Sequence, residues 1–405
     1  MRPSCRGVQI GFFIIALPMF LAEATNCRAQ TGDVLCREGV GNFDADLRGS
    51  AKVHVGAVKN GGLATRSCEA TLIWGDQHVT VANGVFEVDL DAFGADLGWG
   101  VPVSAFQLKK SDSECCRSYQ IYSLQKLPHL LRSLTGGTFF CAADTDLDGR
   151  VEIWTDDGAS LEGIENLTGL ELDSPPTVVL RFEHNRLLDV SSQFQPYFDS
   201  VITNLRARLD QRSIKDFKES DGKLLPSQTI APEKMQRLRR VKIAILEIVW
   251  SYLYSGREAE AWAALADVWP SADAERIRAE IIKARNHGMR LQVDGVAPVT
   301  KNRKKHAMVF DLTVEKRESG LIPPRAILLR RPPGQTSESI PVGGEEFLNL
   351  TVDSAGKVRS VEPAGNSKSV PPELIDAATG WKFIPALSDG RAVASRMRLA
   401  VSDRR

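Results

Sequence analysis

The stretch Phe347-Leu-Asn-Leu-Thr-Val352 alternates apolar and polar residues, as a half-buried β-strand does. Asp353-Ser-Ala-Gly356 follows with residue types that suit a tight turn, and Lys357 to Val361 returns as a second strand. These residues predict a β-hairpin, and the sequence around it completes one small domain.

A short helix and a second hairpin are predicted after the first hairpin. Pro371 to Ala378 opens with two prolines, keeps apolar residues at helical spacing and is followed by Gly380, which ends the helix. Trp381 to Ala386 and Arg391 to Val401 then form two strands around the turn Asp389-Gly390. The predicted order is strand, strand, helix, strand and a long final strand.

Three spaced motifs in this domain resemble the C-terminal domain of the TonB energy-transducer family. They are Val352-Asp-x-x-Gly-x-Val358, Trp381-x-Phe383-x-Pro385-Ala386 and Asp389-Gly390, and the resemblance covers about residues 336–402. Members of that family use such a domain in the periplasm to hold an extended peptide of an outer-membrane receptor as an added strand. Here Pro332 to Pro341 replaces the segment that usually begins the domain, so its first strand and helix are expected to be missing.

The resemblance implies that the final strand binds a peptide of an envelope or outer-membrane protein. An edge strand presents a row of unpaired N–H and C=O groups, which a partner strand can use. The predicted binding residues alternate along this strand: Arg391, Val393, Ser395, Met397, Leu399 and Val401.

The start of the chain is typical of a secretory signal peptide. Arg2 and Arg6 precede an apolar run from Ile10 to Ala22, and Ala22-Glu-Ala24 fits a cleavage site, so residues 1–24 are expected to be removed. The run is shorter than the roughly 20 residues that a membrane span needs. We therefore expect a periplasmic or secreted protein, with an uncleaved inner-membrane anchor as the alternative.

The composition is that of a globular protein with several domains, and its formal net charge is zero. A basic segment, residues 301–305, lacks the interleaved aromatic residues that often accompany nucleic-acid binding, and the chain is expected to be exported. No nucleic-acid partner is predicted.

Six cysteines remain after the predicted cleavage, all in the first 141 residues. An even number of cysteines in an exported domain predicts disulfides, and six allow 15 complete pairings. The spacing contains no Cys-x-x-Cys motif of the kind that binds zinc. The disulfide candidates are Cys27, Cys36, Cys68, Cys115, Cys116 and Cys141.

Residues 31–190 read as a β-rich domain that carries one Asp-rich loop, with sandwich and barrel both open. Alternating aspartates followed by glycine can wrap a hard cation, so calcium is a candidate cofactor. The alternative is an acidic surface turn without a metal. The candidate ligands are Asp144, Asp146, Asp148, the carbonyl of Arg150, Glu152 and Asp156.

Residues 191–289 are predicted to be helical, and residues 290–335 form a strand-rich basic bridge to the C-terminal domain at 336–405. The pair of helices within 243–269 is similar to a single tetratricopeptide hairpin, which alone favours a packing role. The fold class is therefore α+β and multidomain.

No catalytic motif is found, so the sequence favours a non-enzymatic exported binding or adaptor protein, with a possible link to TonB-type transport. One alternative is a true TonB-type energy transducer with an uncleaved N-terminal anchor. The other is a calcium-dependent secreted enzyme with its site in the β-rich domain.

Overall fold

A computed structural model of the chain has the predicted mixed α+β, multidomain fold, with strands in three regions and helices in the middle of the sequence. The predicted signal peptide and Cys27 lie outside the residues that the structure describes. Those residues are 34–47, 51–58, 66–112, 115–161, 163–165, 167, 171–224, 231–298, 309–313, 320–330, 342–365 and 370–401.

Two antiparallel sheets form the first part of the N-terminal β-rich region. Their strand orders are β1-β6-β7-β8-β9 and β2-β3-β4-β5. Apolar side chains from both sheets, among them Val53, Leu72 and Phe106, share one core, so the two sheets pack as layers. The strands are β1 (Cys36–Arg37), β2 (Phe43–Leu47), β3 (Ala51–Ala57), β4 (Cys68–Trp74), β5 (Gln77–Val85), β6 (Glu87–Ala95), β7 (Val103–Lys109), β8 (Arg117–Ser123) and β9 (His129–Gly137).

A third sheet connects this region to the helices. Its order is β10-β11-β12-β13-β14, and β14 adds in parallel to β13. Its strands are β10 (Phe140–Ala143), β11 (Glu152–Asp156), β12 (Thr177–Glu183), β13 (Arg186–Asp189) and β14 (Gly295–Val296). Trp154 of β11 and Trp250 of the helical region belong to one apolar core, so sheet and helices are not separately packed units.

The helical region follows the predicted periodicity closely. Gly256 adopts a φ of 81° between two helices, a conformation that glycine reaches at little cost, so the chain reverses there into a helical hairpin. The α-helices are α2 (Gln195–Ala207), α3 (Gln211–Lys218), α4 (Pro232–Tyr254), α5 (Glu258–Val268) and α6 (Ala274–His287), and the short 3-10 helices are η1 (Gly158–Leu161), η3 (Ser191–Phe194) and η4 (Met289–Gln292). Trp269, which follows α5, is buried.

The C-terminal region forms a sheet of order β16-β21-β22-β18-β19, with β15 beside β22, and a separate pair β17-β20. Trp381 is fully buried in its core and donates its indole N–H to the Arg330 carbonyl. The elements are β15 (Val309–Asp311), β16 (Leu321–Ile322), β17 (Arg325–Leu328), β18 (Val342–Val352), β19 (Val358–Pro363), α7 (Pro372–Thr379), β20 (Lys382–Ile384), β21 (Ala386–Ser388) and β22 (Arg391–Val401).

The segment predicted as a bridge, residues 290–335, has no sheet of its own among the described residues. Its strand β14 joins the third N-terminal sheet, whereas β15, β16 and β17 pair with β22, β21 and β20. The C-terminal unit therefore begins, in structural terms, well before residue 336.

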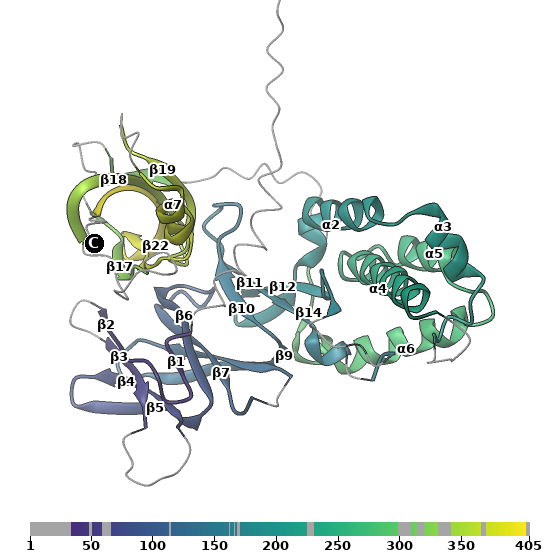
Figure 1. Cartoon of the computed structure of the whole chain (residues 1–405). Coiled ribbons are helices and arrows are strands. Elements are labelled where there is room, and N and C mark those ends of the chain that lie inside the picture. Colours follow the sequence, from purple (N-terminus) through teal and green to yellow (C-terminus); the bar gives the residue numbers. More distant parts are fainter. Residues whose placement is uncertain are drawn as a thin grey trace, which may run out of the picture.

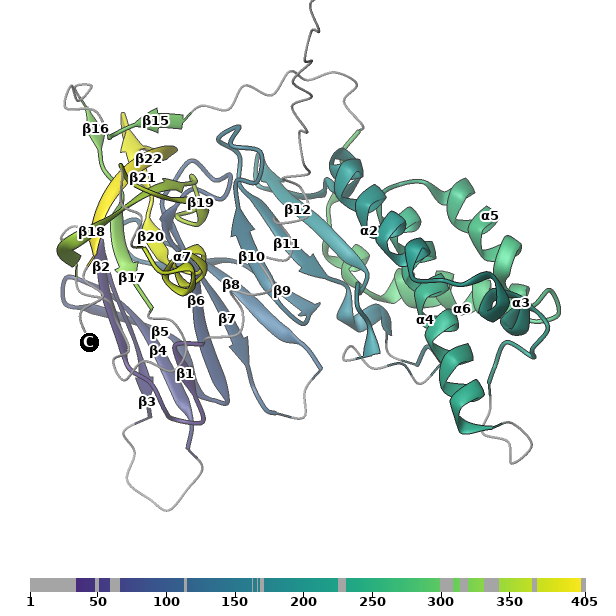
Figure 2. The ribbon, with the colours of Figure 1, turned by 45° about the horizontal axis from the view of Figure 1, so that its top comes forward.

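The C-terminal strands and α7 lie on one side of the N-terminal sheets, and the helices lie on the other (Figure 1). Turning the molecule shows β10, β11 and β12 between the N-terminal sheets and the helices (Figure 2). Within the described residues, no helix combines the length and the apolar character that crossing a membrane requires.

Candidate functional site

The predicted peptide-binding strand, β22, lies inside its sheet over much of its length. On one side it pairs antiparallel with β18, for example Leu350 with Met397. On the other side β21 pairs with Arg391–Val393, and β15 pairs in parallel with Ala394–Arg396. The expectation of an open edge along the whole of β22 therefore needs correction, because only the part after Arg396 has an unoccupied side among the described residues.

One hydrogen bond fixes the direction of the main-chain groups at that open part. The Leu312 N–H donates to the Arg396 carbonyl at 2.8 Å, so Arg396 faces β15. Main-chain groups of successive strand residues point to opposite sides. Arg398 and Ala400 therefore also face the β15 side, whereas Met397 faces β18.

The residues whose main-chain groups point away from β18 therefore alternate with the residues that the sequence predicted to bind a peptide. Ser395, Met397, Leu399 and Val401 pair toward β18, so their main-chain groups are used within the sheet. The residues with outward N–H and C=O groups are Arg398 and Ala400.

The strand β15 stops before it reaches Arg398 because of a local turn. Both the N–H and the hydroxyl of Thr313 donate to the Asp311 carboxylate, at 2.8 and 2.6 Å. A side chain that captures an N–H two residues later competes with a sheet ladder. The ladder on this side of β22 therefore ends at Arg396 within the described residues.

The opposite side of the C-terminal unit is fixed to the N-terminal sheets by two buried ion pairs. Lys382 Nζ lies 3.0 Å from both Asp89 carboxylate oxygens, and Lys357 Nζ lies 2.6 Å from Asp91. All four side chains are at most 7% exposed. Ile384 adds an apolar contact, since it belongs to the core of the N-terminal layers.

Burial is the largest influence on the Asp89–Lys382 pair. It raises the pKa of the Asp89 carboxyl and lowers the pKa of the Lys382 ammonium, while each charge opposes the shift of the other. Asp91 is also held by the Tyr119 hydroxyl and the Ala142 N–H. Removing either lysine would leave a buried carboxylate without its counter-ion.

The Asp-rich loop lies against the hairpin turn between β18 and β19. The Asp144 N–H donates to the Asp353 carboxylate at 3.0 Å, and the Ser354 hydroxyl donates to the Asp144 carboxylate at 2.9 Å. Gly356 allows this tight turn, because its φ is 83° and a Cβ there would lie 2.0 Å from the Phe383 carbonyl oxygen. The loop is thus part of the same interface.

Three of the predicted calcium ligands come together in this loop. Carboxylate oxygens of Asp144, Asp146 and Asp148 lie within 4.8 Å of one another. Burial and the neighbouring Asp353 charge raise the pKa of Asp144 to about 7. Three converging carboxylates are a plausible set for a hard cation.

The other two predicted carboxylate ligands, Glu152 and Asp156, have partners within the protein. Glu152 pairs with Arg181 at 3.2 Å, and burial raises its pKa to about 8. Asp156 lies at the far end of β11 from the loop and accepts from the Thr138 N–H and hydroxyl. The guanidinium of Arg150, whose carbonyl is the predicted ligand, pairs with Asp148. The structure thus gathers three of the five carboxylate candidates, and Asp156 is a correction to the predicted set.

The sequence analysis did not identify the acidic residues of β6 as part of an interface. Glu87, Asp89 and Asp91 alternate with Val88 and Leu90, which is a strand with one acidic face. That pattern is typical of a solvated surface, yet all three carboxylates are buried. The only signal was the presence of Lys357 and Lys382 at strand positions far along the chain.

The cysteine prediction is confirmed where the structure describes it. Cys36 bonds to Cys68, and the adjacent residues Cys115 and Cys116 bond to each other. Cys141 is also disulfide-bonded, to a partner outside the described residues.

A scan against protein-family models, a search of curated proteins and a search of solved structures each return no match to this chain. The resemblance to the TonB C-terminal domain therefore rests on the three sequence motifs, and the function that it implies stays a prediction.

Proposed function

We propose that the chain is an exported binding protein whose C-terminal unit takes up an extended peptide of an envelope or outer-membrane partner at the outer side of β22. The observation that carries the proposal is β15. The chain itself adds a short extended segment to this side of β22, so the edge already accepts a strand.

The proposed binding site is the part of β22 after Arg396, on the same side of the strand as β15. Arg398 and Ala400 offer two N–H and two C=O groups there, and among the described residues no strand lies on that side of them. Main-chain pairing supplies affinity in strand addition, while side chains select the partner. Arg398 is exposed, and an edge arginine discourages indiscriminate pairing.

The test compares Arg398→Pro with Arg398→Ala in the full-length chain. Proline removes the outward N–H but no hydrogen bond to β18, so the fold should survive, whereas alanine keeps the N–H. We expect the alanine variant and the wild type to capture the same partner from an envelope extract, and the proline variant to lose it. Melting curves verify that all three chains are folded.

Met397→Pro is the matched control, because its N–H faces β18 and its loss should destabilise the sheet itself. The proposal is wrong if the folded Arg398→Pro variant keeps the same partner with unchanged affinity, or if the wild type captures no envelope protein.

A further inference from the structure

The bond between Cys115 and Cys116 differs from the other described disulfides in its exposure. Cys115 is exposed and Cys116 is partly exposed in the connection from β7 to β8. Cys36 and Cys68 are fully buried, and Cys141 is only 2% exposed. A reagent in solution can therefore reach one of these disulfides much more easily than the others.

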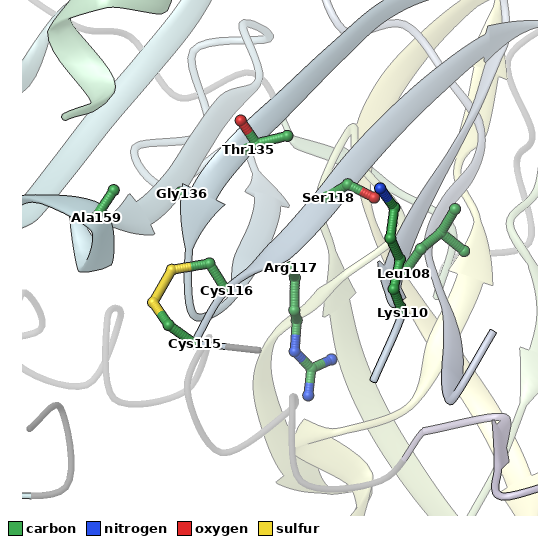
Figure 3. Close-up of a pocket in the computed structure, with 9 residues that line it drawn as sticks. All are labelled: Leu108, Lys110, Cys115, Cys116, Arg117, Ser118, Thr135, Gly136 and Ala159. Atoms are coloured by element: carbon green, nitrogen blue, oxygen red, sulfur yellow. A yellow bond between two sulfur atoms is a disulfide. The ribbon is translucent and has the colours of Figure 1, made fainter. Parts of the chain in front are cut away.

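A pocket of about 330 Å³ lies beside this disulfide. Figure 3 shows the two sulfur atoms at one side of it, with Thr135 and Gly136 from β9 and Ala159 from η1 nearby. A pocket of this volume is at the lower end of the range that binds small molecules. It offers an approach to the sulfur atoms for a small reagent.

Two cationic side chains line the pocket, and one of them is paired with a carboxylate. Lys110 and Arg117 line it, and none of its described lining residues is acidic. Arg117 pairs with Glu87 at 2.5 Å through one nitrogen, while its other terminal nitrogen is buried and has no hydrogen-bond partner. Positive charge near a cysteine stabilises its thiolate, and a more stable thiolate is a better leaving group.

Neighbouring cysteines also make the exchange readily reversible. After the bond opens, the peptide unit between the two residues keeps both thiols close, so either can attack a mixed disulfide on the other. Such an intramolecular step has a high effective concentration. Opening the ring breaks no long-range link in the fold, because the two cysteines are adjacent in the sequence.

We propose that Cys115–Cys116 is a thiol–disulfide exchange site for small thiols, whereas Cys36–Cys68 is a structural disulfide. An incoming thiolate bonds to the Cys115 sulfur, the S–S bond breaks and Cys116 leaves as a thiolate. With a dithiol, the second thiol then attacks the sulfur of its own molecule and releases Cys115. The protein disulfide gains two electrons and two protons, and the dithiol becomes a cyclic disulfide.

The test uses dithiothreitol on the folded full-length chain, followed by alkylation at successive times and peptide mass mapping. Trypsin releases Ser111–Arg117, which contains Cys115 and Cys116 and no other cysteine. We expect this peptide to gain two alkyl groups at least about tenfold faster than the peptides that contain Cys36 and Cys68. A monothiol, 2-mercaptoethanesulfonate, should be trapped on Cys115.

Two results would overturn the proposal. One is equal reduction rates for the two disulfides in the folded chain. The other is a Ser111–Arg117 peptide that stays unmodified until denaturant is added. The rate comparison is internal to the wild type and so does not depend on a variant that folds. As a further check, the double variant Cys115→Ser/Cys116→Ser should lack the fast phase and keep the slow one.

Discussion

Two acidic regions meet the C-terminal unit, and they are neutralised in different ways. On β6, Asp89 and Asp91 face the ammonium groups of Lys382 and Lys357. In the Asp-rich loop, the Asp144 carboxylate accepts from the Ser354 hydroxyl and from the main-chain N–H groups of Asp148 and Gly149. Asp89 and Asp91 therefore have cations supplied by the chain, whereas the donors to Asp144 are neutral.

This difference separates a permanent contact from a site that can respond to its surroundings. A buried ion pair holds both charges in place, because breaking it exposes each to a poorly solvating interior. Neutral donors compensate a buried carboxylate only in part, so the pKa of Asp144 rises to about 7 and an added cation would be stabilised there. The β6 pairs are thus structural, and the loop is where we expect a response to added cations.

The largest effect is expected from removing one lysine. Lys382→Met should lower the free energy of unfolding by about 3–5 kcal/mol, because Asp89 remains buried without its partner. Urea unfolding of the full-length chain measures this change. The double variant Asp89→Leu/Lys382→Met should recover much of the loss. Arg396→Met, which breaks the exposed pair with Glu362, should cost less than about 1 kcal/mol. Equal costs for Lys382→Met and Arg396→Met would contradict the comparison.

A buried carboxylate in the helices extends the comparison to pH. Glu247 of α4 accepts from the Ser174 N–H at 2.6 Å, and burial raises its pKa from 4.5 to about 7. Its favourable contribution is fully present below about pH 4.5 and is lost as the pH rises through about 7, a change of roughly 3 kcal/mol.

Glu247→Gln keeps the acceptor and removes the titration. The difference in unfolding free energy between wild type and variant should therefore change between pH 4 and pH 8, measured by urea unfolding. A flat difference for Glu247→Gln would show that burial does not perturb this carboxyl.

The smallest effect is expected from calcium. At roughly 2 mM calcium, a loop site of the affinity typical of extracellular modules stabilises the fold by about 1–2 kcal/mol, so the melting temperature should rise by about 1–3 °C and fall on chelation. Asp146→Ala and Asp148→Ala should abolish this response. Asp156→Asn should keep it, because Asp156 lies away from the loop. Identical melting curves in calcium and in chelator would leave the loop as a metal-free turn.

The sequence predicted the helices and strands far better than it predicted which strands pair with one another. The hairpin at Phe347, the helix at Pro372 and the helical hairpin at Gly256 were all correct, because side-chain periodicity reports which face of an element is buried. The pairing of β15 with β22 was not predicted. Its residues Val309–Asp311 form a three-residue strand, too short for a pattern to indicate which edge it joins.

The same limit applies to the candidate site. The sequence correctly identified β22 as a long strand, but the alternation that selected Met397 concerns side chains, whereas peptide pairing depends on main-chain direction. That direction became clear only from the Leu312–Arg396 hydrogen bond. Likewise, Asp89 resembles a solvated residue until Lys382, 293 positions later, is placed beside it.

These long separations affect how the chain folds as it is made. The N-terminal sheets emerge first, with Asp89 and Asp91 in place, but their lysines lie 293 and 266 residues further along, respectively. Until the last strands emerge, β6 carries two carboxylates that favour water, so its sheet is poorly stabilised. Contacts of such high sequence separation slow folding. The contact between the first sheets and the C-terminal unit therefore forms only after the segments that carry Lys357 and Lys382 have been made.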